Sequence, residues 1–209
     1  MGVLIIVFNC TNYDETYIMG YCNSFVKIGI DKEFNYFGIR FLPGIFPSLF
    51  NIDASELSNH YERLNTVQPC IYNVIQQSKD RCLCLQDLCD ELNIYFIKHI
   101  NKIDKPFDNR FFCALETILK SKGSIIIEKD LNDGISSRHL QRLFNFYIGD
   151  TAKSFCRIVR FQNLLKIDPS VKLIKSEKSY YDFGYYDQTH FIKEFKLFYG
   201  KTPLKIAAE

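Results

Sequence analysis

The alternation of apolar and polar positions separates a strand-rich beginning from a long helical remainder. Residues 3–8 form a β-branched apolar run, and residues 17–28 are rich in aromatic and aliphatic side chains. Residues 34–42 are typical of a third strand, which Pro43-Gly44 ends. Because three strands cannot close into a barrel, this small sheet requires helices packed on it or a partner.

Helical signals follow within the same part of the chain. Asp53-Ala54-Ser55-Glu56 has the pattern of a capping box, which predicts the start of a helix. An amphipathic helix is predicted where apolar side chains recur at helical spacing, at Leu85, Leu88, Leu92, Tyr95 and Phe96. Residues 101–108 are polar and contain Pro106, so we place a domain boundary there. The predicted domains are a small α+β domain over residues 1–105 and a helical domain over residues 106–209.

A helix over residues 109–121 is predicted to open the second domain. Asp108 can cap its start and Gly123 closes its end. Its apolar stripe is predicted to consist of Phe112, Leu115, Ile118 and Leu119.

Two similar segments follow, about 51 residues apart. Each consists of a short helix, a glycine turn, a capped longer helix and a closing glycine. The turn glycines are Gly134 and Gly184, the caps are Ser136 and Asp187, and the closing glycines are Gly149 and Gly200. Such a unit is a helix-turn-helix, whose second helix fits the major groove of DNA.

A linker helix over residues 152–167 is predicted between the two segments. Asp150 or Thr151 caps it, and Asp168-Pro169 ends it. A last helical turn begins at Thr202-Pro203, with proline at the first helical position.

Composition and charge narrow the function classes. Apolar residues make up 47% of the 209 residues, which excludes a disordered chain. The run at residues 3–8 is far shorter than the roughly 20 residues of a membrane span, and no basic segment precedes it as in a signal peptide. We therefore expect a cytoplasmic, nucleoid-associated protein with no membrane partner.

The charge is distributed unevenly along the chain. Residues 1–109 carry a net charge of −4 and residues 110–209 carry +6. This makes nucleic acid the first candidate partner of the second part, and a solvated cationic face is the alternative.

The eight cysteines do not form a recognisable metal site. Cys82, Cys84 and Cys89 lack the paired C-x2-C spacing of common zinc sites, and neither His60 nor His99 lies at ligand spacing from them. Buried, inert thiols are the preferred interpretation of this cluster, and neither a metal nor a cofactor is predicted.

The second segment carries a long motif, which reads Gly184-Tyr185-Tyr186-Asp187-Gln188-Thr189-His190-Phe191, followed by Phe195-Lys196 and Gly200-Lys201-Thr202-Pro203. This motif resembles the signature of the AraC/XylS family of bacterial transcription regulators. The first segment, Ser136 to Phe144, is similar to the upstream helix-turn-helix of the same family. The resemblance covers about residues 108–206. It implies a mainly α fold, with two helix-turn-helix units on one long linker helix reaching successive major-groove faces of one duplex.

The resemblance also implies which side chains bind DNA. They are Arg138, Gln141, Arg142, Gln188, Thr189, Lys193, Lys196 and Lys201. Arginine can pair with guanine and glutamine with adenine, and the last two lysines are candidate phosphate contacts. A solvated helix face is the alternative for the whole set. Two roles stay open: His190 either reads bases or is structural, and Arg160, three residues after Arg157, either holds the two units together or binds phosphate.

The first domain carries a shorter resemblance. Phe37 to Gly44, with Phe46, Leu49 and Phe50, resembles the end of a cupin-like sensor domain in one AraC-type subgroup. Such domains are usually longer, so residues 1–105 are expected to form a shortened sensor-like or dimerisation domain. The family also favours a small alanine in the first helix of each unit, where Ser179-Tyr180 and Asp130-Leu131-Asn132 stand here. Added bulk at such a contact should cost about 1–3 kcal/mol.

These observations predict a sequence-specific DNA-binding transcription regulator. Its expected partners are double-stranded promoter DNA and RNA polymerase, while a homodimer and a small-molecule effector are left open. A thiol- or ligand-responsive sensor with weakened DNA binding is the alternative. A small enzyme is not expected, because the sequence has no P-loop, G-x-S-x-G or H-E-x-x-H motif.

Overall fold

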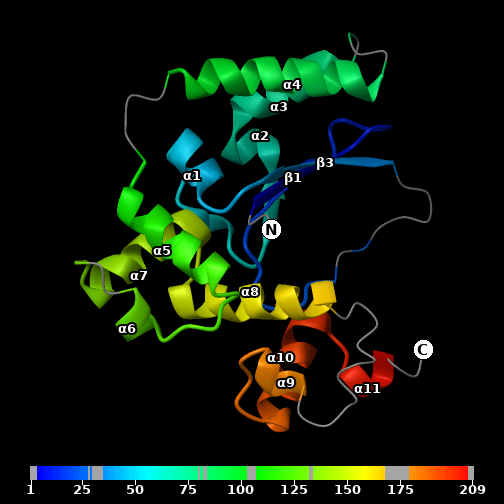
Figure 1. Ribbon diagram of the computed structural model, residues 1–209. Helices are drawn as coiled ribbons and strands as arrows, with labels where there is room; N and C mark the ends of the chain where they lie inside the picture. Colours follow the sequence, from blue (N-terminus) through cyan, green and yellow to red (C-terminus); the bar gives the residue numbers. More distant parts are fainter. Residues whose placement is uncertain are drawn as a thin grey trace. The chain divides into compact units, whose positions relative to one another are not determined.

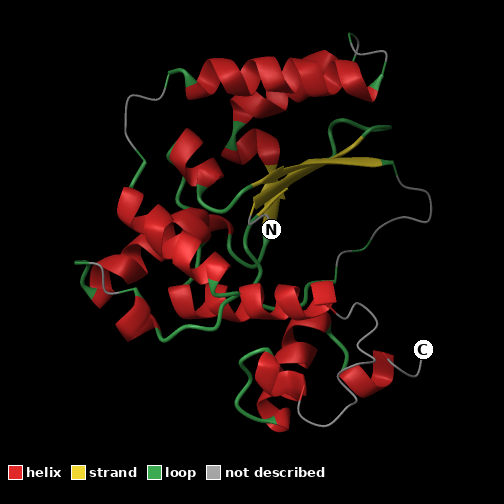
Figure 2. Ribbon diagram, in the orientation of Figure 1, coloured by secondary structure: helices red, strands yellow, loops and turns green. Residues whose placement is uncertain are grey.

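The structure, a computed structural model, describes residues 4–27, 29, 35–79, 81, 84–102, 107–131, 134–167 and 179–206. It consists of two compact units. The N-terminal unit comprises residues 1–21, 28–107 and 145–149, and the C-terminal unit comprises residues 22–27, 108–144 and 150–209. Among the described residues, the strands all belong to the N-terminal unit (Figure 2). The domain boundary between residues 105 and 106 stays a prediction, since residues 103–106 lie outside the described part.

The N-terminal unit contains a four-stranded antiparallel sheet among its described residues, with the order β3-β1-β2-β4. The strands are β1 (Leu4–Asn9), β2 (Thr16–Met19), β3 (Tyr36–Phe41) and β4 (Tyr61–Arg63). Alternation along β1 buries Leu4, Ile6 and Phe8 on one face. The prediction of three strands is wrong by one. All three residues of β4 are exposed, so it has no apolar alternation, and only its pairing with β2 makes it a strand.

Helices cover the buried face of this sheet with apolar side chains. They are α1 (Ile45–Phe50), α2 (Leu64–Val67), α3 (Pro69–Ser78) and α4 (Leu85–Ile100), with the 3-10 helix η1 at Ala54–Leu57. The predicted α4 is confirmed, and its Leu88 and Leu92 join the core. The predicted helix at residue 53 is only η1: the Asp53 side chain accepts the backbone N–H of Ser55 at 2.9 Å, and the chain then leads into β4.

The C-terminal unit is helical. Its elements are α5 (Asn109–Lys120), α6 (Ile127–Asp130), α7 (Ser137–Ile148), α8 (Ala152–Ile167), α9 (Ser179–Asp182), α10 (Gln188–Tyr199) and α11 (Pro203–Ile206), with the end of α7 grouping with the N-terminal unit. Figure 1 shows α8 as one continuous helix, against which both α5 and α10 pack. The predicted fold class, mainly α with a small α+β beginning, is confirmed.

Helix α8 contributes to two aromatic clusters. The ring centroid of Phe155 lies 6.1 Å from that of Phe144 of α7. The Phe144 centroid lies 5.2 Å from that of Phe111 of α5. Further along α8, Phe161 packs with Phe195 of α10. The linker helix α8 therefore contributes a buried aromatic side chain to the core of each helix-turn-helix.

The predicted stripe on α5 is partly wrong. Leu115 and Ile118 are buried as expected, but their buried companions are Phe111 and Ala114, and Leu119 is exposed. Positions 111, 114, 115 and 118 satisfy the same helical spacing, so periodicity alone did not distinguish the two faces.

A short segment before β3 belongs to the C-terminal unit. The backbone N–H of Phe25 donates to the carbonyl of Leu197 at 2.7 Å, and the Phe25 ring packs against Gly200. Asn23 Nδ2 donates to Asp150 Oδ2 at 2.9 Å. The sequence pattern indicated one apolar stretch over residues 17–28; its first part is β2, and residues 22–27 lie along the second helix-turn-helix.

Asp108 should stabilise the C-terminal unit in a pH-dependent way. Its carboxylate caps α5 through the N–H of Arg110 and pairs with Arg110 Nη2 at 2.8 Å. The hydrogen bonds from the Arg110 side chain lower the pKa of Asp108. The stabilisation is therefore present above the unfolded pKa of roughly 3.9 and is lost as the pH falls through the lower folded value. We expect Asp108→Ala to cost about 1 kcal/mol at pH 7 in urea unfolding, and less below about pH 4. An equal cost at both pH values would contradict this.

Candidate nucleic-acid interface

Helix α7, the predicted first recognition helix, is built by local signals. Gly134 turns the chain with φ 75°, and the Ser136 hydroxyl then accepts the backbone N–H of His139 at 3.3 Å. This cap satisfies an amide that the helix itself leaves without a partner. Leu140, Leu143 and Phe144 are buried. On the opposite side, the predicted DNA-facing residues Arg138, Gln141 and Arg142 are all exposed, and so is Asn145.

Helix α10, the predicted second recognition helix, is built by the same kinds of signal. Gly184 turns the chain with φ 76°, and Asp187 Oδ1 accepts the N–H of His190 at 2.7 Å. Phe191 and Phe195 are buried. The predicted contacts Gln188, Thr189, Lys193, Lys196 and Lys201 are exposed. Both α7 and α10 have twelve residues, and each is followed by a left-handed glycine, at φ 96° for Gly149 and φ 84° for Gly200.

Arg142 is oriented within α7. Its Nη2 lies 3.0 Å from Nδ1 of His139, one turn earlier. Because a guanidinium can only donate, His139 Nδ1 is the acceptor. The contact restrains the exposed Arg142 side chain, whose planar donor fork is of the kind that can pair with a base edge.

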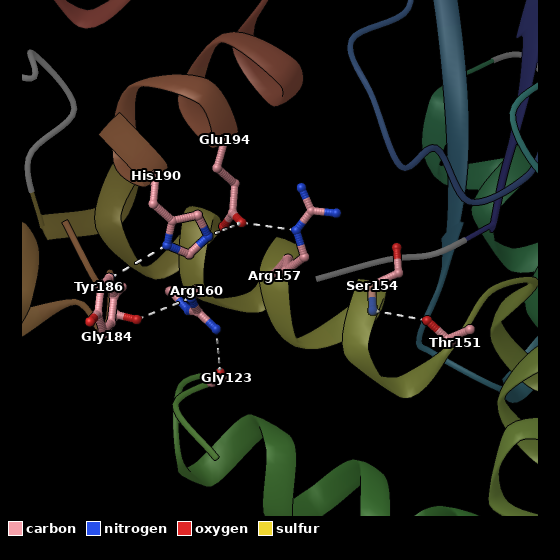
Figure 3. A network of polar contacts seen from close by, with 9 residues as sticks. All are labelled: Gly123, Thr151, Ser154, Arg157, Arg160, Gly184, Tyr186, His190 and Glu194. Carbon is pink, nitrogen blue, oxygen red and sulfur yellow. Dashed lines mark hydrogen bonds and ion pairs between the residues drawn. The ribbon is translucent and has the colours of Figure 1, made fainter. Parts of the chain in front are cut away.

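Arg160 joins three parts of the C-terminal unit (Figure 3). Its Nη1 donates to the carbonyl of Gly184 in the second helix-turn-helix at 3.1 Å. Its Nη2 donates to the carbonyl of Gly123, after α5, at 3.3 Å. The guanidinium also lies over the Tyr185 ring, 5.4 Å from its centroid. Of the two roles left open for Arg160, these contacts favour the structural one.

A second charged network lies beside it (Figure 3). Nε of Arg157 donates to Oε2 of Glu194 at 2.9 Å, and His190 Nε2 lies 3.4 Å from the same oxygen. Nδ1 of His190 accepts the backbone N–H of Tyr186 at 3.4 Å. Because both ring nitrogens are engaged inside the protein, a structural role for His190 is favoured over base reading. Burial raises the pKa of the neighbouring Tyr185 phenol, and the negative charge of Glu194 raises it further.

Sequence reasoning missed Glu194. The available signal was its place on α10, three residues after Phe191 and next to Phe195, where an apolar side chain is expected. The cap of α8, which was left open, is Thr151: its hydroxyl accepts the N–H of Ser154 at 3.1 Å (Figure 3).

The alanine contacts favoured by the family are replaced by an aromatic packing in the second helix-turn-helix. Tyr180 of α9 is partly buried, and its ring stacks on Phe191 with centroids 6.3 Å apart. Asn132 and the side chain of Ser179 lie outside the described residues, and the expected energetic cost of the added bulk stays a prediction.

The predicted burial of the cysteine cluster is wrong for Cys84, which is exposed, while Cys89 is partly buried. The reason is that Cys84 is the N-cap of α4, where its backbone N–H donates to Asp87 at 3.1 Å, and helix ends face solvent. Cys82 lies outside the described residues. Elsewhere, burial raises the pKa of the Cys156 thiol to about 11. The residues that the structure describes contain no group of three His, Cys, Asp or Glu that could hold a metal ion.

Comparison with known families decides the class of the C-terminal unit. Residues 133–208, which span both α7 and α10, match the model of a Helix-turn-helix domain. The chain carries an AraC-type helix-turn-helix domain. Residues 1–63, in front of it, match a Domain of unknown function (DUF6597). The pair of matches agrees with the AraC/XylS resemblance.

The AraC-type domain supports a DNA-binding transcription regulator, a class that is generally non-enzymatic. Comparison with curated proteins and with solved structures gave no match. No helix within the described ranges is long and apolar enough to cross a membrane.

Proposed function

We propose that this protein is a sequence-specific transcription regulator that reads promoter DNA with α7 and α10 together. The observation that carries the proposal is the structural repeat: two capped twelve-residue helices, each after a left-handed glycine turn, expose polar faces and belong to one AraC-type domain. Because recognition helices fit the major groove, two of them on one linker helix suit two successive groove faces.

The exposed side chains divide into two classes of contact. Arg138, Gln141 and Arg142 on α7, with Gln188 and Thr189 on α10, have the donors and acceptors that read base edges. The lysines, Lys193, Lys196 and Lys201, supply charge for the phosphate backbone, which positions the protein without reading sequence. RNA polymerase is proposed as the partner at the promoter. A homodimer and a small-molecule effector stay open, as does the thiol-responsive alternative.

Selection of binding sites from randomised duplex DNA tests the proposal. The full-length protein should enrich a site with two short blocks about one helical turn, roughly 10 base pairs, apart. Affinity for that site should fall steeply with salt, because phosphate contacts release counterions. Enrichment of a single block would contradict the use of both helices, and the absence of any enrichment would contradict sequence-specific reading.

Arg142→Ala should weaken binding to the selected site by about 1–3 kcal/mol and relax the preference at one base pair. Lys201→Ala should instead weaken binding to all sequences alike and reduce the salt slope by about one. Lys98→Ala, which removes an exposed charge from α4, is the matched control and should change neither quantity. Fluorescence anisotropy over a salt series measures both. An unchanged preference in Arg142→Ala would show that α7 does not read bases through this residue.

A further inference from the structure

A buried carboxylate interrupts the apolar inner face of α10. Phe191, Glu194 and Phe195 follow helical spacing, and all three are buried. The side chain of Glu194 is only 1% exposed. Burying a paired carboxylate is often no more favourable than burying a well-packed apolar side chain of similar volume. Packing alone therefore does not account for Glu194 at this position.

The carboxylate is held from two helices at once. Its Oε2 accepts from Arg157 Nε of α8 at 2.9 Å and lies 3.4 Å from His190 Nε2, one turn earlier on α10 (Figure 3). Arg157 is itself held, because its guanidinium lies over the Phe198 ring, 5.4 Å from the centroid. The other oxygen of Glu194, Oε1, is buried and makes no hydrogen bond of standard geometry among the described residues, although the buried Tyr185 phenol is a neighbouring donor to this carboxylate. Neither this oxygen nor the Tyr185 hydroxyl is fully satisfied, which adds to the cost of burying the carboxylate.

His190 extends the network to the turn in front of the helix. Its Nδ1 accepts the N–H of Tyr186, so the neutral ring carries its proton on Nε2, the nitrogen that faces Glu194. The carboxylate thus favours the tautomer that holds the turn. The candidate base-reading residues Gln188 and Thr189 lie between Tyr186 and His190 in the chain, and Lys193 directly precedes Glu194.

We propose that Glu194 is a positioning residue that sets the base preference of the second recognition helix through Arg157 and His190, without touching DNA. The inference rests on the proposed function. A buried ion pair with directional hydrogen bonds accepts one rotation of α10 on α8, whereas an aliphatic side chain accepts several. Because bidentate base contacts need a defined approach, a rotated helix loses preference even when it stays folded.

The decisive variant is the double replacement Arg157→Met with Glu194→Leu, which leaves no unpaired buried charge. Glu194→Gln is the second variant, since it keeps the shape and removes only the charge. Glu116→Gln is the matched control, because it removes an exposed glutamate of α5 that pairs with Lys120 at 2.6 Å. Melting temperatures establish that each full-length variant is folded. If the double variant fails to fold, Glu194→Gln decides.

The readout is the ratio of the Kd values of one variant for two DNA sites. An error in the fraction of active protein affects both Kd values equally and cancels in the ratio. For each variant, Kd is measured for the selected two-block site and for sites with the first or the second block scrambled. In the unaltered protein, scrambling either block should weaken binding at least about tenfold. In the double variant the second-block ratio should fall below about threefold while the first-block ratio is unchanged. Glu194→Gln should lower the second-block ratio in the same direction, and Glu116→Gln should change neither ratio.

Each other outcome has a separate meaning. If the unaltered protein shows two blocks and the variants keep both ratios, Glu194 is a packing residue and only this inference fails. An equal fall of both ratios would show a general loss of structure and would also overturn the inference. If the unaltered protein shows no second block, the proposed two-helix function itself fails, and the role of Glu194 fails with it.

Discussion

Replacing Gly123 by alanine should destabilise the C-terminal unit by about 2–5 kcal/mol, enough to abolish specific DNA binding at elevated temperature. Gly123 follows α5 with φ +77°, in the left-handed region that disfavours side chains. A Cβ there would also overlap the carbonyl oxygen of Cys156 on α8 and lie 3.0 Å from the amide nitrogen of Arg160. Since these are backbone atoms of a continuous helix, they cannot move aside without displacing α8 from α5.

Gly134→Ala is the matched control for this experiment. Gly134 has φ +75°, almost the same conformation, but among the described residues other than its chain neighbours no atom lies within 4 Å of the position of a Cβ. Its replacement should therefore lower the free energy of unfolding only by the cost of holding alanine in the left-handed conformation, about 1–2 kcal/mol. Urea unfolding followed by circular dichroism compares the two. Equal costs would show that the close approach of Gly123 to α8 contributes nothing.

Replacing Arg160 by methionine should cost about 2–4 kcal/mol, because it removes two charged hydrogen bonds and one cation–π contact. The lost bonds are those to the carbonyls of Gly123 and Gly184, which join the end of α5 to the turn before α10. Beyond stability, we expect the distance between the two DNA blocks to become less critical. Inserting two base pairs between the blocks should weaken binding by the unaltered protein at least about tenfold, and binding by the variant much less.

Arg81→Met is the control for the loss of an arginine. Arg81 is exposed and lies 4.0 Å from Glu91, a surface ion pair of little expected value. It should leave both stability and the dependence on block spacing unchanged. A variant at Arg160 that is less stable but keeps the full dependence on spacing would show that these contacts do not define the separation of the two helices.

The elements that carry the side chains proposed to contact DNA could be predicted from local signals. The caps at Ser136 and Asp187 and the left-handed glycines at 134 and 184 act within a few residues of where they stand in the chain, and the structure has each of them. The exposed positions of Arg138, Gln141 and Arg142 follow directly once the buried stripe of α7 is known. Helix period and capping therefore sufficed to predict both α7 and α10.

The sequence pattern was less successful in predicting the short elements and the buried face of α5. Strand β4 exists because Tyr61–Arg63 pairs with β2, and the turn after Asp53 stays a 3-10 helix because the chain must reach that strand. On α5, two overlapping stripes had the same period, and the contact of Phe111 with Phe144 selected one of them. In each case the deciding interaction comes from a distant part of the chain.

The amino-acid sequence by itself determined α7 and α10, their polar faces and the resemblance to the AraC/XylS family, because periodicity, caps and glycine turns are local properties of the chain. Only the tertiary structure decided what joins these helices. The bonds from Arg160 to the carbonyls of Gly123 and Gly184 link residues 37 and 24 positions apart, and the pair of Arg157 with Glu194 spans 37. The sequence pattern around a charged residue does not identify its hydrogen-bond partner. The partner is determined by the packing that brings distant segments together and removes the water between them.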